Sequence, residues 1–210
     1  MPRLLDLFCC QGGASAGYTA AGWEVVGVDI DPQPHYPYEF HQGDALKWAL
    51  EHHDEFDAFH ASPPCQAWTN AQKIRGNEHE DFIGATRSLF KMIGKPWIIE
   101  NVVGAPLVDP VEMCGSMFGL TTYRHRLFES SERLLVPAHP KHVVPTTKMG
   151  RPVKPGEFMH VVGNFAGVDH ARHVMGMPWA TRDGLREAIP PAYTEFLGGQ
   201  ILDHLLASAA

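Results

Sequence analysis

The first hundred residues alternate short apolar runs with helix-like stretches, and this alternation restricts the folds open to the chain. Apolar runs of strand length lie around residues 3–10, 23–30, 56–61 and 96–102. Gly- and Ala-rich or polar stretches separate them, and residues 82–93 carry apolar side chains at the spacing of an amphipathic helix. Strands that alternate with helices predict an α/β fold with a mainly parallel sheet.

Chemically reactive side chains follow the ends of the predicted strands. Asp29 and Glu100 close apolar runs, Asp44 lies in a Gly-Asp-Ala turn, and Cys65 follows two prolines. In open α/β sheets ligands bind at the carboxyl ends of the strands. We therefore expect these four side chains to belong to one site.

The composition fits a single globular domain. The chain has 210 residues, enough for a sizeable core, and its four cysteines show neither a disulfide framework nor a paired zinc-binding spacing. No apolar run approaches the roughly 20 residues that span a bilayer, and residues 1–10 are interpreted as a strand rather than a signal peptide. These features predict a cytoplasmic protein with no membrane partner.

Positive charge is concentrated in one segment. The formal net charge of −7 argues against a nucleic-acid partner, but residues 123–157 carry seven Lys or Arg against three Asp or Glu. A phosphate backbone responds to local charge, although a solvated loop explains this segment equally simply. His139 and His142 in "HPKH" show no further ligand nearby in the sequence. We interpret them as surface or phosphate-contacting residues and expect no metal.

A glycine-rich stretch, "DLFCCQGGASAGY", follows the first predicted strand. It matches neither G-x-G-x-x-G nor the phosphate-binding G-x-x-x-x-G-K-[ST] loop, and no lysine follows its glycines. Asp29 is placed to accept hydrogen bonds from ribose hydroxyls, and Asp44 either accepts from an exocyclic amine or caps a helix. The pattern predicts a nucleoside-bearing cofactor without a strong phosphate site, which S-adenosylmethionine fits better than NAD.

The stretch "FHASPPCQAWTN" holds Cys65 in a rigid frame, because Pro63 and Pro64 fix their own φ angles. A tight turn with an incidental thiol is one interpretation. The other is a nucleophile, since a thiolate attacks well when its pKa is lowered. Glu100 could then share or donate a proton to a pyrimidine ring as the thiol adds to it.

These motifs, in this order, resemble the cytosine-5 DNA methyltransferases. The similarity covers residues 3 to about 130 and rests on the "DLF…GG" loop, Asp29, "GDA", "PPCQ", "ENV" and "RHR". It implies a Rossmann-like sheet with helices on both faces, S-adenosylmethionine as methyl donor, and double-stranded DNA as partner. The resemblance assigns to the cofactor site Phe8, Gly12, Gly13, Asp29, Ile30, Asp44 and Ala45.

The resemblance also assigns catalytic roles. Cys65 would attack carbon 6 of a flipped cytosine, with Pro64 and Gln66 beside it in the nucleophile loop. Glu100 would bind N3 and the amine of the base. Arg126 would help to hold the base, and Arg124 would lie near the phosphates.

The resemblance divides the chain into three parts: a catalytic domain over residues 1–129, a short basic target-recognition segment over 130–160, and a C-terminal segment over 161–210. So short a segment predicts a recognition site of about two to four base pairs. Cys10 departs from the family, which usually has glycine there. The last helix, after Pro190-Pro191, resembles the helix that packs beside the cofactor loop, and the trimmed form suggests a monomeric, phage-like or restriction-modification enzyme.

Three alternatives remain open at this stage. The same scaffold could methylate cytosine in RNA, or use another donor for a different base modification. It could also be a DNA-binding protein that has lost catalysis, although Cys65, Gln66, Glu100 and Arg126 together argue against that.

Overall fold

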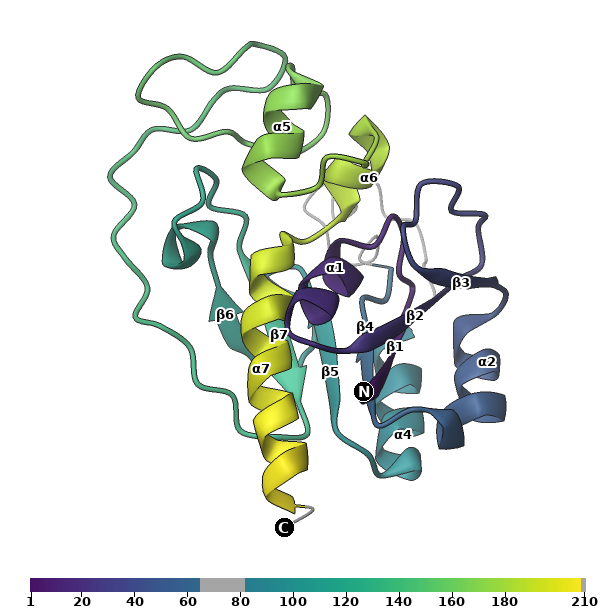
Figure 1. Cartoon of the computed structure of the whole chain (residues 1–210). Coiled ribbons are helices and arrows are strands. Elements are labelled where there is room, and N and C mark those ends of the chain that lie inside the picture. Colours follow the sequence, from purple (N-terminus) through teal and green to yellow (C-terminus); the bar gives the residue numbers. More distant parts are fainter. Residues whose placement is uncertain (65–81, 209–210) are drawn as a thin grey trace.

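The computed structural model describes residues 1–64 and 82–208 (Figure 1). Cys65 and Gln66, two of the expected catalytic residues, lie outside the described residues.

The described residues form a seven-stranded sheet with the order β3-β2-β1-β4-β5-β7-β6. Its strands are β1 Arg3–Leu7, β2 Glu24–Asp29, β3 Glu39–Gln42, β4 Ala58–Ala61, β5 Trp97–Asn101, β6 Val111–Met113 and β7 Arg126–Ser130. The first five strands pair in parallel, whereas β7 pairs antiparallel with both β5 and β6. The predicted mainly parallel sheet is confirmed, and the antiparallel β6–β7 edge was not foreseen.

Helices cover both faces of this sheet, as expected. The helices of the described residues are α1 Gly13–Ala20, α2 Ala45–His52, α4 Phe82–Ile93, α5 Val168–Met175, α6 Arg182–Glu187 and α7 Pro191–Ser208, with short 3-10 turns η1 His53–Glu55 and η3 Gly115–Phe118. Helices α1 and α7 cover one face of the sheet, and α2 and α4 cover the other. In Figure 1, α1 and α7 lie on one side of the strands, and α5 and α6 lie beyond their carboxyl ends.

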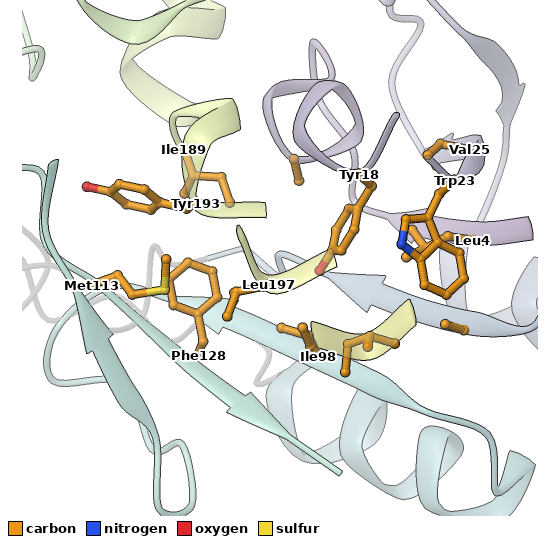
Figure 2. Packing of buried hydrophobic residues seen from close by; sticks show 13 residues of the cluster. Leu4, Tyr18, Trp23, Val25, Ile98, Met113, Phe128, Ile189, Tyr193 and Leu197 are labelled. Carbon is orange, nitrogen blue, oxygen red and sulfur yellow. The ribbon is translucent and has the colours of Figure 1, made fainter. Parts of the chain in front are cut away.

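Neighbouring residues of one strand contribute to opposite cores. Leu4, Val25 and Ile98 pack with α1 and α7 in one cluster, around Tyr18, Trp23, Phe128, Tyr193 and Leu197 (Figure 2). The next residues along the same strands, Leu5, Val26 and Ile99, pack in a second cluster with residues of α2 and α4. Because successive strand side chains point to opposite faces, a sheet covered on both sides requires continuous apolar runs. This is the physical origin of the runs seen in the sequence.

The C-terminal helix α7 packs closely on α1, the helix that follows the glycine-rich loop. A Cβ on Gly17 would lie 2.0 Å from the carbonyl oxygen of Pro191, so only glycine permits this approach. The Thr194 hydroxyl donates to the carbonyl of Ala14 at 2.8 Å. The expected contact of the last helix with the cofactor-loop region is thereby confirmed at the level of α1.

Residues 131–167, between β7 and α5, are irregular, as their prolines predict. The segment runs outside β6 toward α5 in Figure 1, and one isolated bridge joins Thr146 to Phe158. Its end contributes Met159, Val161 and Phe165 to a third apolar cluster with α5 and α6. Within the described part of the chain, no helix is long and apolar enough to cross a membrane.

The α1–α7 contact predicts opposite effects for two glycine substitutions. Gly17→Ala places a methyl group against the backbone of α7 and should lower the free energy of unfolding by about 1–3 kcal/mol. Gly84→Ala in α4 meets no atom within 4 Å and should raise it, by up to about 1 kcal/mol, through helix propensity. Urea unfolding of both variants measures the difference. Equal stability of the two would contradict the proposed close packing.

Candidate active site

The loop that follows β1 has an unusual backbone. Phe8 and Cys10 have φ angles of 57° and 46°, in the left-handed region that non-glycine residues rarely adopt, and Gly12 has a φ of 78°. Cys10 therefore occupies a conformation that glycine adopts freely, which explains why glycine is usual at this position in the family it resembles. Non-glycine residues in this region cluster at functional sites when the surroundings hold them in place.

Asp29 helps to hold this loop. Its Oδ2 accepts a hydrogen bond from the backbone N–H of Cys10 at 2.9 Å, and its Oδ1 accepts from the N–H of Asp31 at 3.0 Å. The carboxylate is 7% exposed and ends β2, beside β1 in the sheet. Each carboxylate oxygen can accept more than one hydrogen bond, so Asp29 can orient the loop and also accept from a ligand.

The remaining expected cofactor residues lie in different settings. Asp44 is the N-cap of α2, where its Oδ1 accepts from the N–H groups of Leu46 and Lys47, each at 3.0 Å. The helix-cap interpretation is thus correct, and the exposed carboxylate keeps its second oxygen for other contacts. Ala45 is buried in the core, whereas Ile30 has 64% of its surface exposed at the end of β2.

The two glycines of the loop serve the internal packing. A Cβ on Gly12 would lie 3.0 Å from the ring of Tyr36, and a Cβ on Gly13 would lie 2.5 Å from the carbonyl oxygen of Ile189. The absence of a side chain therefore lets Gly12 lie against Tyr36 and lets Gly13 lie against the C-terminal segment, whereas the resemblance had assigned both glycines to the cofactor site.

Glu100 and Arg126 form a buried pair across β5 and β7. The Arg126 Nε lies 2.9 Å from Oε1 of Glu100, yet this oxygen accepts no well-aligned hydrogen bond within the described part of the chain. Burial raises the pKa of Glu100, against the opposing effects of Arg126, a Ser62 hydrogen bond and Arg124. A carboxyl group in this setting favours its protonated form more than an exposed glutamate does.

The chain just before Cys65 is tied to the same strand end. The Asn101 side-chain amide donates to the carbonyl of Pro63 at 3.0 Å, and its Oδ1 accepts from the N–H of Val102. Pro64, the last described residue of this segment, is exposed. The sequence presented Asn101 only as part of "ENV", and the structure shows that it ties Pro63, two residues before Cys65, to the end of β5.

Arg124 lies elsewhere than expected. Its guanidinium donates to the carbonyl oxygens of Ala188, Val161 and Arg186, each at 2.7 Å, and the residue is 8% exposed. A guanidinium surrounded by backbone carbonyls is directed into the protein, so the expectation that Arg124 lies near phosphates is corrected to a structural role. Sequence spacing could not distinguish Arg124 from Arg126, because their partners are remote in the chain.

Buried polar groups below the site were missed by sequence reasoning. Asp6, fully buried in β1, accepts from the Ser15 hydroxyl, which is also 2.7 Å from the Tyr36 hydroxyl. Burial raises the pKa of Asp6 to about 7. Tyr18 bonds to Nδ1 of the buried His60 at 2.9 Å, and burial lowers the pKa of His60 to about 3. The one signal for Asp6 was an acid inside an otherwise apolar strand.

The cysteines of the loop are not candidates for the nucleophile. Cys9 is buried, and burial, together with the nearby Asp6 and Asp29, raises the pKa of its thiol well above the usual value. Burial and Asp29 raise the pKa of Cys10 in the same way. Both thiols stay protonated, which agrees with a packing role for Cys9.

Comparisons with known proteins identify the class of fold. A crystal structure assigned as a DNA modification methyltransferase encoded within a prophage (E. coli) superposes with a TM-score of 0.70 at 13% identity, covering 99% of this chain and 100% of that chain. The S. pombe Dnmt2 methyltransferase gives 0.63 at 13% identity, covering 98% and 99%. The Entamoeba histolytica methyltransferase EhMeth gives 0.63 at 11%, covering 100% and 99%.

The fold is therefore the Rossmann-like fold of methyltransferases. A family model for the C-5 cytosine-specific DNA methylases matches residues 2–105, which include the glycine-rich loop, the Pro-Pro-Cys motif and Glu100. Residues 2–105 therefore belong to this family of enzymes. A search of curated proteins found no match.

The buried Asp6 predicts a pH-dependent stability. Its pKa is about 7 in the folded state and near 4 in the unfolded state, so unfolding releases a proton between these values. This contribution favours the fold below pH 4 and is lost as the pH rises to about 7. As the pH rises through this window, the wild type should therefore lose stability relative to Asp6→Asn. The difference in the free energy of unfolding should change by on the order of a few kcal/mol.

Urea unfolding at steps between pH 4 and pH 8 measures that difference. Asp57→Asn, in an exposed position before β4, is the control and should show no comparable trend. A pH-independent difference for Asp6→Asn would show that Asp6 is ionised in the fold.

Proposed function

We propose that the protein transfers a methyl group from S-adenosylmethionine to carbon 5 of a cytosine in double-stranded DNA, through a covalent adduct with Cys65. The observation that carries this proposal is the buried pair of Glu100 and Arg126 beside the anchored start of the nucleophile loop. Burial raises the pKa of Glu100, which suits a carboxyl group that must give a proton to a ring nitrogen.

The residues support a balanced sequence of bond changes. The Cys65 thiolate adds to carbon 6 of the base while the Glu100 carboxyl protonates N3, so the electron pair of the 5,6 double bond becomes available at carbon 5. Carbon 5 takes the methyl group as the sulfonium of the donor becomes a neutral thioether, S-adenosylhomocysteine. Carbon 5 then loses its hydrogen as a proton to water, and the electron pair of that C–H bond restores the 5,6 double bond and expels the Cys65 thiolate. N3 returns its proton to Glu100. Arg126, paired with Glu100, orients the carboxyl group and balances its charge when it is ionised.

The strand ends also fit the proposed methyl donor. The Asp29 carboxylate, held by two backbone N–H groups at the end of β2, suits ribose hydroxyls, and the turn at Asp44 lies at the end of the neighbouring β3. The loop of Phe8 to Gly12 contains no cation for a phosphate, in keeping with a sulfonium cofactor. Bound S-adenosylmethionine supplies an electrophilic methyl group.

Reaching a stacked base requires extruding it from the duplex, at a cost of a few kcal/mol that contacts in the pocket offset. Favourable contacts to the phosphates would come from the basic segment. Lys141, Lys148 and Lys154 are exposed there. Arg151 is different, because its guanidinium forms a two-pronged ion pair with Glu157, with contacts of 2.8 and 2.5 Å. We therefore assign the phosphate contacts to the lysines.

The adduct itself is the decisive test. Duplex DNA containing 5-fluorocytosine blocks the last step, because fluorine cannot leave as a proton does, so the protein should stay covalently attached to the DNA. Incubation with radiolabelled S-adenosylmethionine should give a labelled protein–DNA band that survives denaturing electrophoresis. Cys65→Ser should form no such band, whereas Cys10→Ser should retain it if it folds.

Each of the other outcomes would change the proposed function or the proposed nucleophile. An adduct on the matching RNA but not on DNA would move the activity to RNA. An adduct in Cys65→Ser would exclude Cys65 as the nucleophile. No adduct on either nucleic acid, with DNA affinity retained, would favour a binding protein or a different donor.

The lysines predict the salt dependence of DNA binding. Changing Lys141, Lys148 and Lys154 together to glutamine should lower the slope of log affinity against log salt by about 2 to 3, since each phosphate that a lysine neutralises adds about 0.9 to it. Lys47→Gln with Lys91→Gln, two exposed lysines on α2 and α4, is the control and should leave the slope unchanged. Fluorescence anisotropy across a salt series measures the slope, and an unchanged value in the triple variant would exclude binding of phosphates by these lysines.

A further inference from the structure

A group of one cysteine and three histidines gathers at the β6–β7 edge of the sheet. It comprises Cys114, His125, His139 and His142, and one possible ligand atom from each residue lies within 4.8 Å of every other. The Cys114 Sγ is 3.4 Å from Nε2 of His142, and the Nε2 atoms of His125 and His139 are 3.1 Å apart. We call these four residues the Cys-His cluster.

The fold explains how residues so far apart in the chain meet. Met113 pairs with Arg126 in the antiparallel ladder of β6 and β7. Cys114 directly follows Met113 and His125 directly precedes Arg126, so the two lie side by side at the end of that ladder. The other two ligands come from "HPKH" in the irregular segment after β7. The His142 ring stacks on Tyr123 with centroids 3.6 Å apart, which holds it against the sheet edge.

We propose that the Cys-His cluster binds one zinc ion through Cys114, His125, His139 and His142. Tetrahedral zinc with Zn–N bonds of about 2.0–2.1 Å and a Zn–S bond of about 2.3 Å sets its ligand atoms about 3.4–3.6 Å apart. The two separations above are close to these edges, and the widest, up to 4.8 Å, must close by about 1.2–1.4 Å. Side-chain rotation of the exposed His139 can supply that movement, while His142 stays stacked on Tyr123.

Stacked surface histidines are the competing explanation, and the geometry argues against it. Two imidazole nitrogens approach to 3.1 Å, and a buried thiol faces a third ring. Three imidazole rings in direct contact form no hydrogen bonds that they could not form equally well with water. A metal cation that binds one lone pair from each of the four ligand atoms explains why these four side chains converge.

The ligand set selects the metal and its role. Thiolate and imidazole suit zinc, and four protein ligands leave no position for substrate water, which is the pattern of a structural site. Binding requires the Cys114 thiol to lose its proton to solvent, after which the thiolate bonds to the metal. The sequence showed no further ligand near His139 and His142, whereas the β6–β7 ladder brings Cys114 and His125 close to them in space.

The position of the cluster indicates what a bound ion would do. It would fasten the basic segment at His139 and His142 to the edge of the catalytic sheet. The carbonyl of His125 also accepts from the Arg126 side chain at 2.9 Å, so the fixed ligand lies next to the arginine that pairs with Glu100. The metal site itself does not depend on the proposed methyl transfer.

Metal content is the first measurement. The full chain, produced without a polyhistidine tag in zinc-supplemented medium, should contain one zinc per chain after gel filtration, by elemental analysis. Cys114→Ser, and His139→Gln combined with His142→Gln, should each lose nearly all of it. His170→Gln combined with His173→Gln, a pair with the same spacing on α5, should keep it.

Cobalt substitution reports the coordination directly. Cobalt(II) added to metal-free protein should give a thiolate-to-cobalt charge-transfer band and the intense visible bands of a tetrahedral site, and Cys114→Ser should lack the charge-transfer band. The double variant changes two exposed side chains, so it decides the question even if Cys114→Ser fails to fold. Zinc retained in the double variant, or wild-type protein with neither zinc nor a cobalt band, would overturn the proposal.

Discussion

The guanidinium of Arg124 joins the two halves of this protein. It holds three carbonyl oxygens of the C-terminal segment, at Val161, Arg186 and Ala188, while the carbonyl of Arg124 accepts from the Tyr193 hydroxyl at 2.9 Å. Its φ angle of 33° is a strained conformation for a residue with a side chain, and such strain persists only where surrounding contacts hold it. These bonds add to the packing of α7 on α1 and Phe128, and they fix the start of β7 against the C-terminal segment.

Three consecutive residues at this point have three different partners. Arg124 is directed into the C-terminal segment, His125 into the Cys-His cluster, and Arg126 toward Glu100. The basic segment and the Glu100 carboxyl group are thus connected through one short stretch of backbone. Small changes in the position of β7 would therefore move the basic segment and Glu100 together.

The site combines two kinds of carboxyl group. Asp29 accepts from two backbone N–H groups, an arrangement suited to a carboxylate that accepts hydrogen bonds. Glu100 lies in a buried position where its pKa rises despite Arg126, an arrangement suited to proton transfer. The difference in environment, rather than residue type, separates a group suited to cofactor binding from one suited to acid catalysis. Asp6 is a third carboxyl group whose pKa is set by its environment. It lies beneath the glycine-rich loop, beside the hydroxyl groups of Ser15 and Tyr36.

The local elements and the order of the motifs could be predicted from the amino-acid sequence alone. Apolar runs such as residues 23–30 reported strands buried on both faces, and the acid at Asp29 marked a strand end, because period and chain ends are local properties. The tertiary structure decided which side chains meet. In the fold, Arg124 and Arg126 have different partners, and Gly13 and Gly17 pack against the C-terminal segment. Cys114 lies next to His142, which is 28 residues away in the sequence. Such contacts depend on how the strands pair and on where the C-terminal segment packs. The spacing of residues along the sequence does not specify either of these.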